Sequence, residues 1–315
     1  MSLLLLCMSC KDNETDELIK HNGLVFGTSY SIIYEGQTNY EKGIDSVYRV
    51  VNQSLSTYLP TSDISRINNG DTSVVVDAIF MEAFKKAKKI YKETDGYFDP
   101  TIGRLIDAYG FGSGKEQVAL SSQRIDSLMN GVGFDKVRLE NGRVYCDISH
   151  IEFNVNAFAK GFGIDLVGRY LESKDIRNYL IEIGGEIRAR GTKKGAPWRV
   201  AIEKPNSDGS RSVQKIISLF DESMATSGNY RKFKINEAGQ KIVHTVNAKT
   251  GEAVESNLLS VSVRMKGDCA DVDAYATAFL AMGLKKTKTF LKEHPELRVF
   301  LIFRNSANEL EEFMN

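Results

Sequence analysis

The sequence predicts an α+β fold of mostly antiparallel sheets with segregated helices. Strand patterns dominate the second half of the chain, helical periodicity is confined to separate stretches, and no repeat or low-complexity linker divides the 315 residues. Runs of strands beside segregated helices favour this class over a doubly wound parallel sheet. With 42% apolar and 26% charged residues, the composition is that of a globular protein, which excludes wholesale disorder.

The first half of the chain contains most of the predicted helices. Apolar residues recur at helical spacing over 45–55, and Asp77 is placed to cap a helix that ends near Asp95. Asn141-Gly142 has the composition of a two-residue hairpin turn. The predicted elements are a strand over 24–34, helices over 45–55, 77–95 and 121–130, a hairpin over 136–147 and a helix over 157–171.

The second half is mostly strand. Short stretches rich in β-branched and aromatic residues are separated by glycine turns at Gly184-Gly185, Gly239 and Gly251. Helical spacing returns only after Asp271. The predicted elements are strands over 179–183, 186–190, 198–203, 213–219, 230–235, 241–246 and 258–264, helices over 271–282 and 285–292, and a strand over 299–303.

The N-terminal segment over 1–23 is predicted as a leader and polar tether, with the folded domain over 24–315. The block MSLLLLCMSC is far shorter than the about 20 residues that span a bilayer. It resembles the end of a bacterial lipoprotein signal, in which Ser9 precedes a lipidated Cys10. An accidental apolar start is the alternative.

Charge and cysteine content narrow the possible partners. Lysine plus arginine and aspartate plus glutamate each number 41, so the net charge is zero and nucleic acid is not expected as a partner. Cys7 and Cys10 have CxxC spacing but no second ligand pair nearby. The sequence neither pairs Cys146 with Cys269 nor keeps them apart.

Asp273 and Thr277 form the first candidate site. Residues four apart on a helix share one face, so the carboxylate and the hydroxyl can point at the same hard cation. The same spacing also fits a capped, solvated helix start with an ordinary threonine.

A second candidate lies where a predicted strand passes into a helix after Asn154. Free backbone groups at such a junction suit phosphate or a metal, and Lys160 adds a positive charge for a phosphate. Gly161 and Gly163 allow close packing there. The alternative is that Asn156 is a plain N-cap and Lys160 a solvated residue of the first helical turn.

Two further motifs lie in the second half. Gly184-Gly185 fits either a tight turn or the approach of backbone to a ligand, and it matches no dinucleotide or P-loop fingerprint. Among four histidines, only His244 lies among hydroxyl-rich turns and strands that could form a site. A structural histidine is the alternative.

The order of these motifs along the chain resembles the ApbE family, whose members are FAD:protein FMN transferases. The resemblance covers about residues 24–303 and implies an ApbE-like, T-fold-like architecture with FAD in a cleft between two intertwined subdomains. The stretches that carry it are GTSY (27–30), LSTYLP (55–60), SDISRIN (62–68), TDGYFDPTIG (94–103), YGFG (109–112), AFAKG (157–161), IGGEIRARG (183–191), WRVAIEKP (198–205), TSGNY (226–230), His244, and Asp273 with Thr277.

The resemblance implies a reaction and a location. FAD would be cleaved at its pyrophosphate with Mg²⁺, FMN transferred to a threonine hydroxyl of a target flavoprotein, and AMP released. The acceptor would be a membrane redox subunit or a secreted flavoprotein, and the protein would be lipid-anchored through Cys10 on the outer, periplasmic face of the cytoplasmic membrane. Hydrolysis of FAD to FMN and AMP, or non-catalytic FAD binding, are the alternatives. Intact Asp273, Thr277 and Lys160 argue against a pure binder.

The resemblance also implies roles for individual residues. Asp273, Thr277 and the Ala157 carbonyl would hold the cation, which makes Asp273 catalytic. His244 would deprotonate the acceptor threonine, since an imidazole pKa of about 6.5 suits a base at neutral pH. FAD contacts are implied at Phe26, Thr57, Tyr58, Leu59, Asp95, Lys160, Gly184, Gly185, Ser227, His244 and Thr245.

Two positions depart from the family pattern. Asn154 stands where many members have aspartate, and Asn247-Ala248 replaces the commoner Asp-Pro. The second change alters a turn beside His244 and puts the geometry of that turn in question. Neither change removes a predicted metal ligand.

Overall fold

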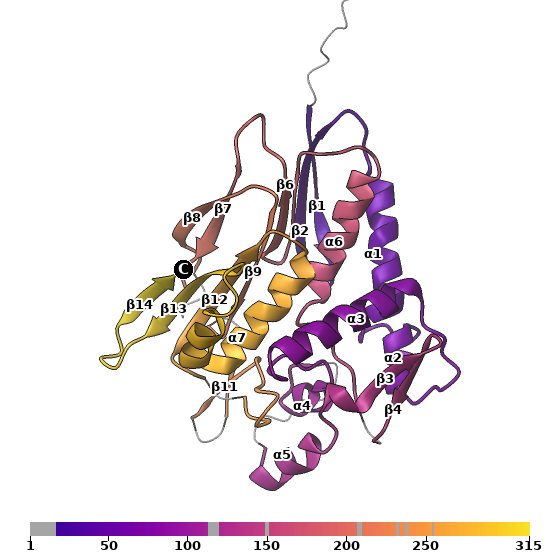
Figure 1. Ribbon diagram of the computed structural model, residues 1–315, viewed down its shortest axis with the longest axis vertical. Coiled ribbons are helices and arrows are strands. Elements are labelled where there is room, and N and C mark those ends of the chain that lie inside the picture. The colour runs from indigo at the N-terminus through magenta and orange to yellow at the C-terminus, as the bar shows by residue number, and fades with distance from the viewer. Residues whose placement is uncertain are drawn as a thin grey trace, which may run out of the picture.

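The computed structural model describes residues 17–112, 120–148, 151–206, 210–230, 233–236, 239–253 and 255–315. Over these residues the chain forms an eight-stranded antiparallel sheet covered on one face by helices (Figure 1), which confirms the predicted α+β class. The strands lie in the order β1 (Glu17–Val25), β2 (Thr28–Gly36), β5 (Tyr179–Ile183), β6 (Glu186–Arg190), β9 (Glu222–Gly228), β12 (Leu258–Met265), β13 (Arg298–Arg304) and β14 (Leu310–Met314).

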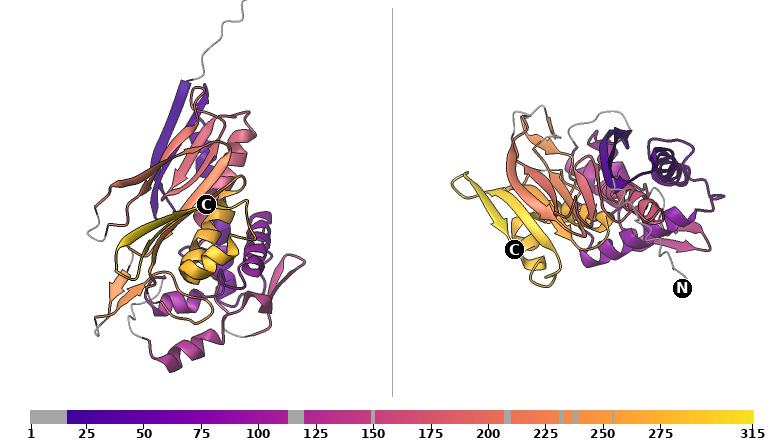
Figure 2. Two further views of the ribbon diagram at one scale, coloured as in Figure 1. Left: turned by 60° about the vertical axis from the view of Figure 1, so that its left-hand side comes forward. Right: turned by 90° about the horizontal axis from the view of Figure 1, so that it is seen from above.

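The helical layer packs on one face of the sheet. Figures 1 and 2 show α6 and α7 side by side against the strands, with α1 and α3 beside them. The helices are α1 (Glu41–Leu55), α2 (Asp63–Asn68), α3 (Ala78–Glu93), α4 (Gly103–Ala108), α5 (Ser122–Met129), α6 (Ala159–Glu172) and α7 (Cys269–Phe290).

Alternation along the strands divides the core between the two faces of the sheet. In β13, Val299 and Leu301 pack in the main cluster under the helices, whereas Phe300 and Ile302 point to the other face. A hairpin of β7 (Trp198–Glu203) and β8 (Val213–Leu219) covers that face, where Trp198 is buried. Two more hairpins are β3 (Val137–Glu140) with β4 (Arg143–Cys146), and β10 (Phe233–Ile235) with β11 (Lys241–Val243).

A third apolar cluster lies beneath the short helices. Leu105 from α4, Tyr109 directly after it and Leu128 from α5 pack against Ile242 and Val246. The chain on both sides of His244 is therefore held against α4 and α5.

An ionic cluster surrounds the start of α7. Asp268 lies 2.7 Å from the Lys86 ammonium and 2.8 Å from the Arg188 guanidinium, measured between the closest polar atoms. Arg188 also pairs with the fully buried carboxylate of Asp165 at 2.6 Å. Asp268, the residue directly before α7, thus binds side chains from α3 and β6.

This cluster predicts a loss of stability in acid. Burial alone would raise the pKa of Asp268, but hydrogen bonds from Lys86 and Arg188 outweigh it and lower the pKa from 3.8 to about 2. A carboxyl group with a depressed folded-state pKa contributes stability above its unfolded pKa, and that contribution is lost as the pH falls from about 4 to about 2. Asp268→Asn is therefore expected to flatten the dependence of the free energy of unfolding on pH between those values.

Urea unfolding at a series of pH values measures this effect. Asp175→Asn is a matched control, because the Asp175 side chain is 93% exposed and pairs only with Arg177 on the surface. If the free energy of unfolding of Asp268→Asn falls as steeply in acid as that of the parent, Asp268 is not the group responsible.

Several predicted elements match closely. The bounds of β5, β6, β7 and β8 are those predicted, and α3 begins after Asp77, whose side chain accepts from the Phe80 N–H. The free cysteines Cys146 and Cys269 are not paired with each other. The two helices predicted over 271–282 and 285–292 correspond to the two parts of α7, which extends to Phe290 with a kink at Gly283.

The prediction of one strand over 24–34 is wrong. Residues Phe26 and Gly27 form a two-residue hairpin turn with φ of +49° and +74°, which separates β1 from β2. The last part of the predicted tether, from Glu17, is strand β1 and belongs to the fold. Its buried His21 lies 3.2 Å from the Tyr34 hydroxyl, measured from the ring nitrogen. The preceding residues, with Ser9 and Cys10, lie outside the described part of the chain.

Other differences concern short or polar elements. Strand β9 was not predicted. Within the strand predicted over 230–235, the described residues form only the shorter strand β10. The ladder of β11 ends at Val243 rather than at residue 246. Helices α2 and α4 and strand β14 were also not predicted.

Candidate functional site

Two adjoining cavities lie where the helical layer meets one end of the sheet. Their volumes are about 410 Å³ and about 390 Å³. Tyr58, Asn156, Lys160 and Gly184 line both, so the cavities share a wall at these residues. Each volume lies within the range of roughly 300–1,000 Å³ that is usual for small-molecule sites.

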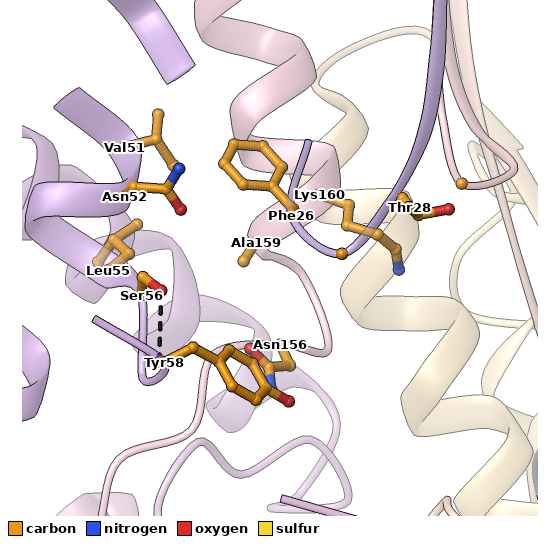
Figure 3. Close-up of a pocket in the computed structure, with 12 residues that line it drawn as sticks. Phe26, Thr28, Val51, Asn52, Leu55, Ser56, Tyr58, Asn156, Ala159 and Lys160 are labelled. Atoms are coloured by element: carbon orange, nitrogen blue, oxygen red, sulfur yellow. Dashed lines mark hydrogen bonds between the residues drawn. The ribbon is translucent and has the colours of Figure 1, made fainter. Parts of the chain in front are cut away.

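The first cavity is formed between α1 and the turn of the β1–β2 hairpin (Figure 3). Val51, Asn52 and Leu55 line it from α1, and Phe26 faces them from the hairpin turn. The Phe26 ring packs edge-on against Tyr48, with ring centroids 5.6 Å apart. This cavity therefore has an apolar wall and two amide side chains, Asn52 and Asn156.

The second cavity has a polar centre. Asp273 and Thr277 enter it from α7, Lys160 from the start of α6, and Ser227 from β9. The hydroxyl oxygens of Ser227 and Thr277 are 3.2 Å apart, and one oxygen of Asp273 accepts the Gly161 N–H at 3.1 Å. Ala157 also lines this cavity.

Three ionisable side chains, Lys160, Glu186 and Asp273, face one another in the second cavity. The Lys160 ammonium lies 3.2 Å from a carboxylate oxygen of Glu186 at the start of β6. Burial lowers the pKa of Lys160, but the carboxylates of Asp273 and Glu186 outweigh that effect and raise it, so Lys160 stays protonated. Burial raises the pKa of Asp273 and of Glu186, the latter to about 8, against the opposing charge of Lys160.

His244 also lines the second cavity. It directly follows β11, and its ring meets the edge of Phe111 with centroids 6.3 Å apart. Thr245 and Val246 line the cavity beside it. The cavity thus brings an imidazole and a carboxylate–lysine pair together from elements far apart in the chain.

The turn after His244 is ordered by Asn247. Its side-chain Oδ1 accepts the Lys249 N–H at 2.9 Å, and its backbone N–H donates to the Glu252 carbonyl at 2.8 Å. Asn154, the other departure from the family pattern, lines the second cavity, and its side-chain oxygen accepts the Asn156 N–H at 3.0 Å.

Most of the predicted site residues lie together. Phe26 lines the first cavity, Tyr58, Lys160 and Gly184 line both, and the rest of the group lines the second. That group is Ala157, Ser227, His244, Thr245, Asp273 and Thr277.

Four predicted contacts lie outside both cavities. Thr57 and Leu59 flank Tyr58, and Gly185 donates to Glu182 at 2.6 Å in the β5–β6 turn. Asp95 is 88% exposed, and Lys249 contacts its carbonyl and carboxylate. It lies two residues before Tyr97, which does line the second cavity.

Sequence reasoning missed Glu186 as a site residue. It is 3% exposed, and its carboxyl group faces the Lys160 ammonium. Its position directly after Gly184-Gly185, at the start of the strand predicted over 186–190, was the available signal. Asn52 was also missed, because its helix was examined for apolar spacing alone.

The cation predicted at this site would have oxygen ligands only. Among the described residues, no group of three or more His, Cys, Asp or Glu side chains is arranged to hold a metal. The predicted set instead combines one carboxylate, one hydroxyl and one backbone carbonyl, all on the second cavity. Hard oxygen donors of this kind suit Mg²⁺, which keeps several ligands from water or phosphate.

Gly161 permits the close approach of α6 and α7 that forms the site. A Cβ atom at this position would lie 2.5 Å from the Cys269 carbonyl oxygen, which belongs to the backbone and cannot rotate away. Gly161→Ala is therefore expected to destabilise the protein by about 1–3 kcal/mol, the usual effect of overpacking. Denaturant unfolding measures it, and a stability equal to that of the parent contradicts this packing.

The chain is similar to known proteins over nearly its full described length. It matches the ApbE family over residues 26–301. It is 33% identical over 293 residues to an FAD:protein FMN transferase of Vibrio cholerae, covering 90% of this chain and 86% of the relative. With the FAD:protein FMN transferase of Haemophilus influenzae it shares 31% identity over 305 residues, 91% of this chain and 87% of the relative. The solved flavin transferase ApbE from Vibrio cholerae matches with a TM-score of 0.84 and 30% identity, covering 95% of this chain and 97% of that one.

Proposed function

This chain belongs to the ApbE family, and on that basis we propose that it is an FAD:protein FMN transferase. The observation that carries the proposal is the pair of adjoining cavities, whose shared wall holds Lys160 beside Asp273. An elongated dinucleotide would occupy both cavities, with its pyrophosphate near the Lys160 ammonium. Lysine acts there as a point charge toward phosphate oxygens.

The residues of the second cavity would carry the transfer. His244 would accept the proton of the acceptor threonine as its oxygen bonds to the phosphorus of the FMN half. The bond from that phosphorus to the bridging oxygen breaks, and AMP leaves with this oxygen. Such a reaction depends mainly on positioning and on stabilisation of charge.

Mg²⁺ would be held by Asp273, Thr277 and the Ala157 carbonyl. When bound, it would supply positive charge for the phosphate oxygens. Lys160, kept protonated by Asp273 and Glu186, would stabilise the same negative charge from the protein side.

A mass spectrum of the acceptor tests the function. The purified protein is incubated with FAD, Mg²⁺ and a flavoprotein that carries a threonine in a short motif with Asp and Ser or Thr, from a membrane redox subunit or a secreted flavoprotein. The expected result is an acceptor heavier by one FMN, with AMP released in equal amount. Free FMN beside an unmodified acceptor identifies an FAD pyrophosphatase, and FAD that stays bound and uncleaved identifies a binding protein.

The same proposal places the protein at the cell envelope, on the outer face of the cytoplasmic membrane. Among the described residues, no helix has the length and apolar character to cross a membrane. The anchor would be a lipid on Cys10, which lies outside the described part of the chain. Expressed with its natural upstream region, the protein is expected to fractionate with membranes, whereas Cys10→Ala is expected to release it. Equal solubility of both forms excludes Cys10 as the anchor.

A further inference from the structure

The start of α7, one turn before Asp273, is capped by a side chain of another helix. Its own N-cap residue, Asp268, makes no side-chain hydrogen bond to the helix. The carboxylate of Asp165 on α6 takes that place. It accepts the Cys269 N–H at 2.7 Å and the Ala270 N–H at 2.9 Å, one with each oxygen.

A second hydrogen bond runs in the opposite direction. The Gly161 N–H at the start of α6 donates to Asp273, one turn further along α7. Each helix therefore binds the first turn of the other through one carboxylate. Gly161 allows this because a side chain there would meet the backbone at Cys269. The position of the Asp273 carboxylate is set by both contacts.

The charge of Asp165 is balanced from the sheet. Its side chain is fully buried, and Arg188 on β6 donates to it at 2.6 Å while also reaching Asp268. Arg188 lies two residues after Glu186 on the same strand, and Glu186 pairs with Lys160. Strand β6 thus pairs with both Lys160 and Asp165 of α6.

We propose that Asp165 is a positioning residue for Asp273: by capping α7 from α6, it fixes the carboxylate that would ligate the cation. The metal part of this inference rests on the proposed function. The buried N–H groups of a helix start need acceptors, and a residue that orients a metal ligand typically contributes 10–100-fold to metal affinity, as an order of magnitude.

Asp165→Asn tests the inference, with Asp268→Asn as matched control. Both substitutions remove one carboxylate charge from Arg188, but only Asp165 accepts N–H groups of α7. Mn²⁺ is the probe: free Mn²⁺ is counted by electron paramagnetic resonance, with and without FAD. Asp165→Asn is expected to weaken Mn²⁺ binding about 10-fold or more and to raise the half-saturating Mg²⁺ concentration more than the KM for FAD. Asp268→Asn is expected to lower Tm without that shift.

A second measurement is independent of metal binding. Amide hydrogen exchange over 269–273 is expected to accelerate in Asp165→Asn more than in Asp268→Asn. Where Asp165→Asn alone does not fold, the double variant with Arg188→Gln, which removes both charges, is used for both measurements. Equal Mn²⁺ affinity and equal exchange in the two single variants overturn the inference.

The metal site of the proposed function is tested separately from the role of Asp165. Mn²⁺ binding by the parent that persists in Asp273→Ala shows that Asp273 is not the metal ligand. The exchange measurement then still decides whether Asp165 holds the start of α7.

Discussion

Asp273→Ala is expected to reduce FMN transfer by on the order of 10³-fold, because a bound metal supplies several kcal/mol of charge stabilisation in such reactions. Asp273 is 3% exposed and is the only predicted metal ligand with a formal charge. Removing it would leave a hydroxyl and a carbonyl, which do not neutralise a divalent cation. Mass spectrometry of the acceptor, together with AMP release, measures the loss.

Asp271→Ala is the matched control for this prediction. Asp271 lies on the same turn of α7, but its carboxylate pairs with Lys86 at 3.1 Å and lines neither cavity. It should retain transfer activity. Treating the parent with EDTA should reproduce the Asp273→Ala loss, and added Mg²⁺ should restore the parent alone. Full activity of Asp273→Ala in metal-free buffer would show that Asp273 is not a metal ligand on which transfer depends.

His244→Ala is expected to slow transfer by roughly 10²–10⁴-fold, the usual contribution of a general base. His244 lines the same cavity as Asp273 and Lys160. Because its proposed role is to act on the acceptor hydroxyl rather than on the dinucleotide, kcat should fall while the affinity for FAD changes little.

His294→Ala is the control for the histidine. The His294 ring stacks on Phe290 with centroids 4.0 Å apart, and it lines neither cavity. Flavin fluorescence measures FAD affinity in both variants, and single-turnover transfer measures the chemical step. An FAD affinity that falls as steeply as the rate in His244→Ala would assign the histidine to binding instead.

The sequence predicts those elements of the fold in which the pattern of apolar and polar residues matches the burial of the side chains. Strands β5 to β8 alternate or run apolar, and their predicted bounds agree with the structure. Strand β9 reads Glu-Ser-Met-Ala-Thr-Ser-Gly, too small and polar to be recognised. It becomes a strand because β6 and β12 flank it and α7 covers it. Tertiary context, rather than local preference, forms this element.

The same distinction applies to the site. Asp273, Thr277, Lys160 and His244 are recognisable because each lies in a motif that resembles one family. Glu186 is different, since its importance comes from a contact with a lysine 26 positions earlier in the chain (186 − 160). Asp165, like Glu186, is an ordinary acidic residue until its helix is placed against α7. Contacts of this kind between two elements cannot be recognised from residue spacing along one helix or strand.

The order of strands in the main sheet has a consequence for how the chain folds during synthesis. From β1 to β14, neighbours in space follow the same order as in the sequence, and the helical layer and three hairpins are excursions between them. Each strand can therefore join the free edge of a sheet that earlier strands have already formed, without opening an existing pair. Loop closure over long separations, which slows folding, is then needed chiefly once, between β2 and β5. The growing chain therefore acquires the wall of the first cavity that α1 and the β1–β2 turn form early, and it gains Asp273 and Thr277, the proposed cation ligands, only when α7 is added.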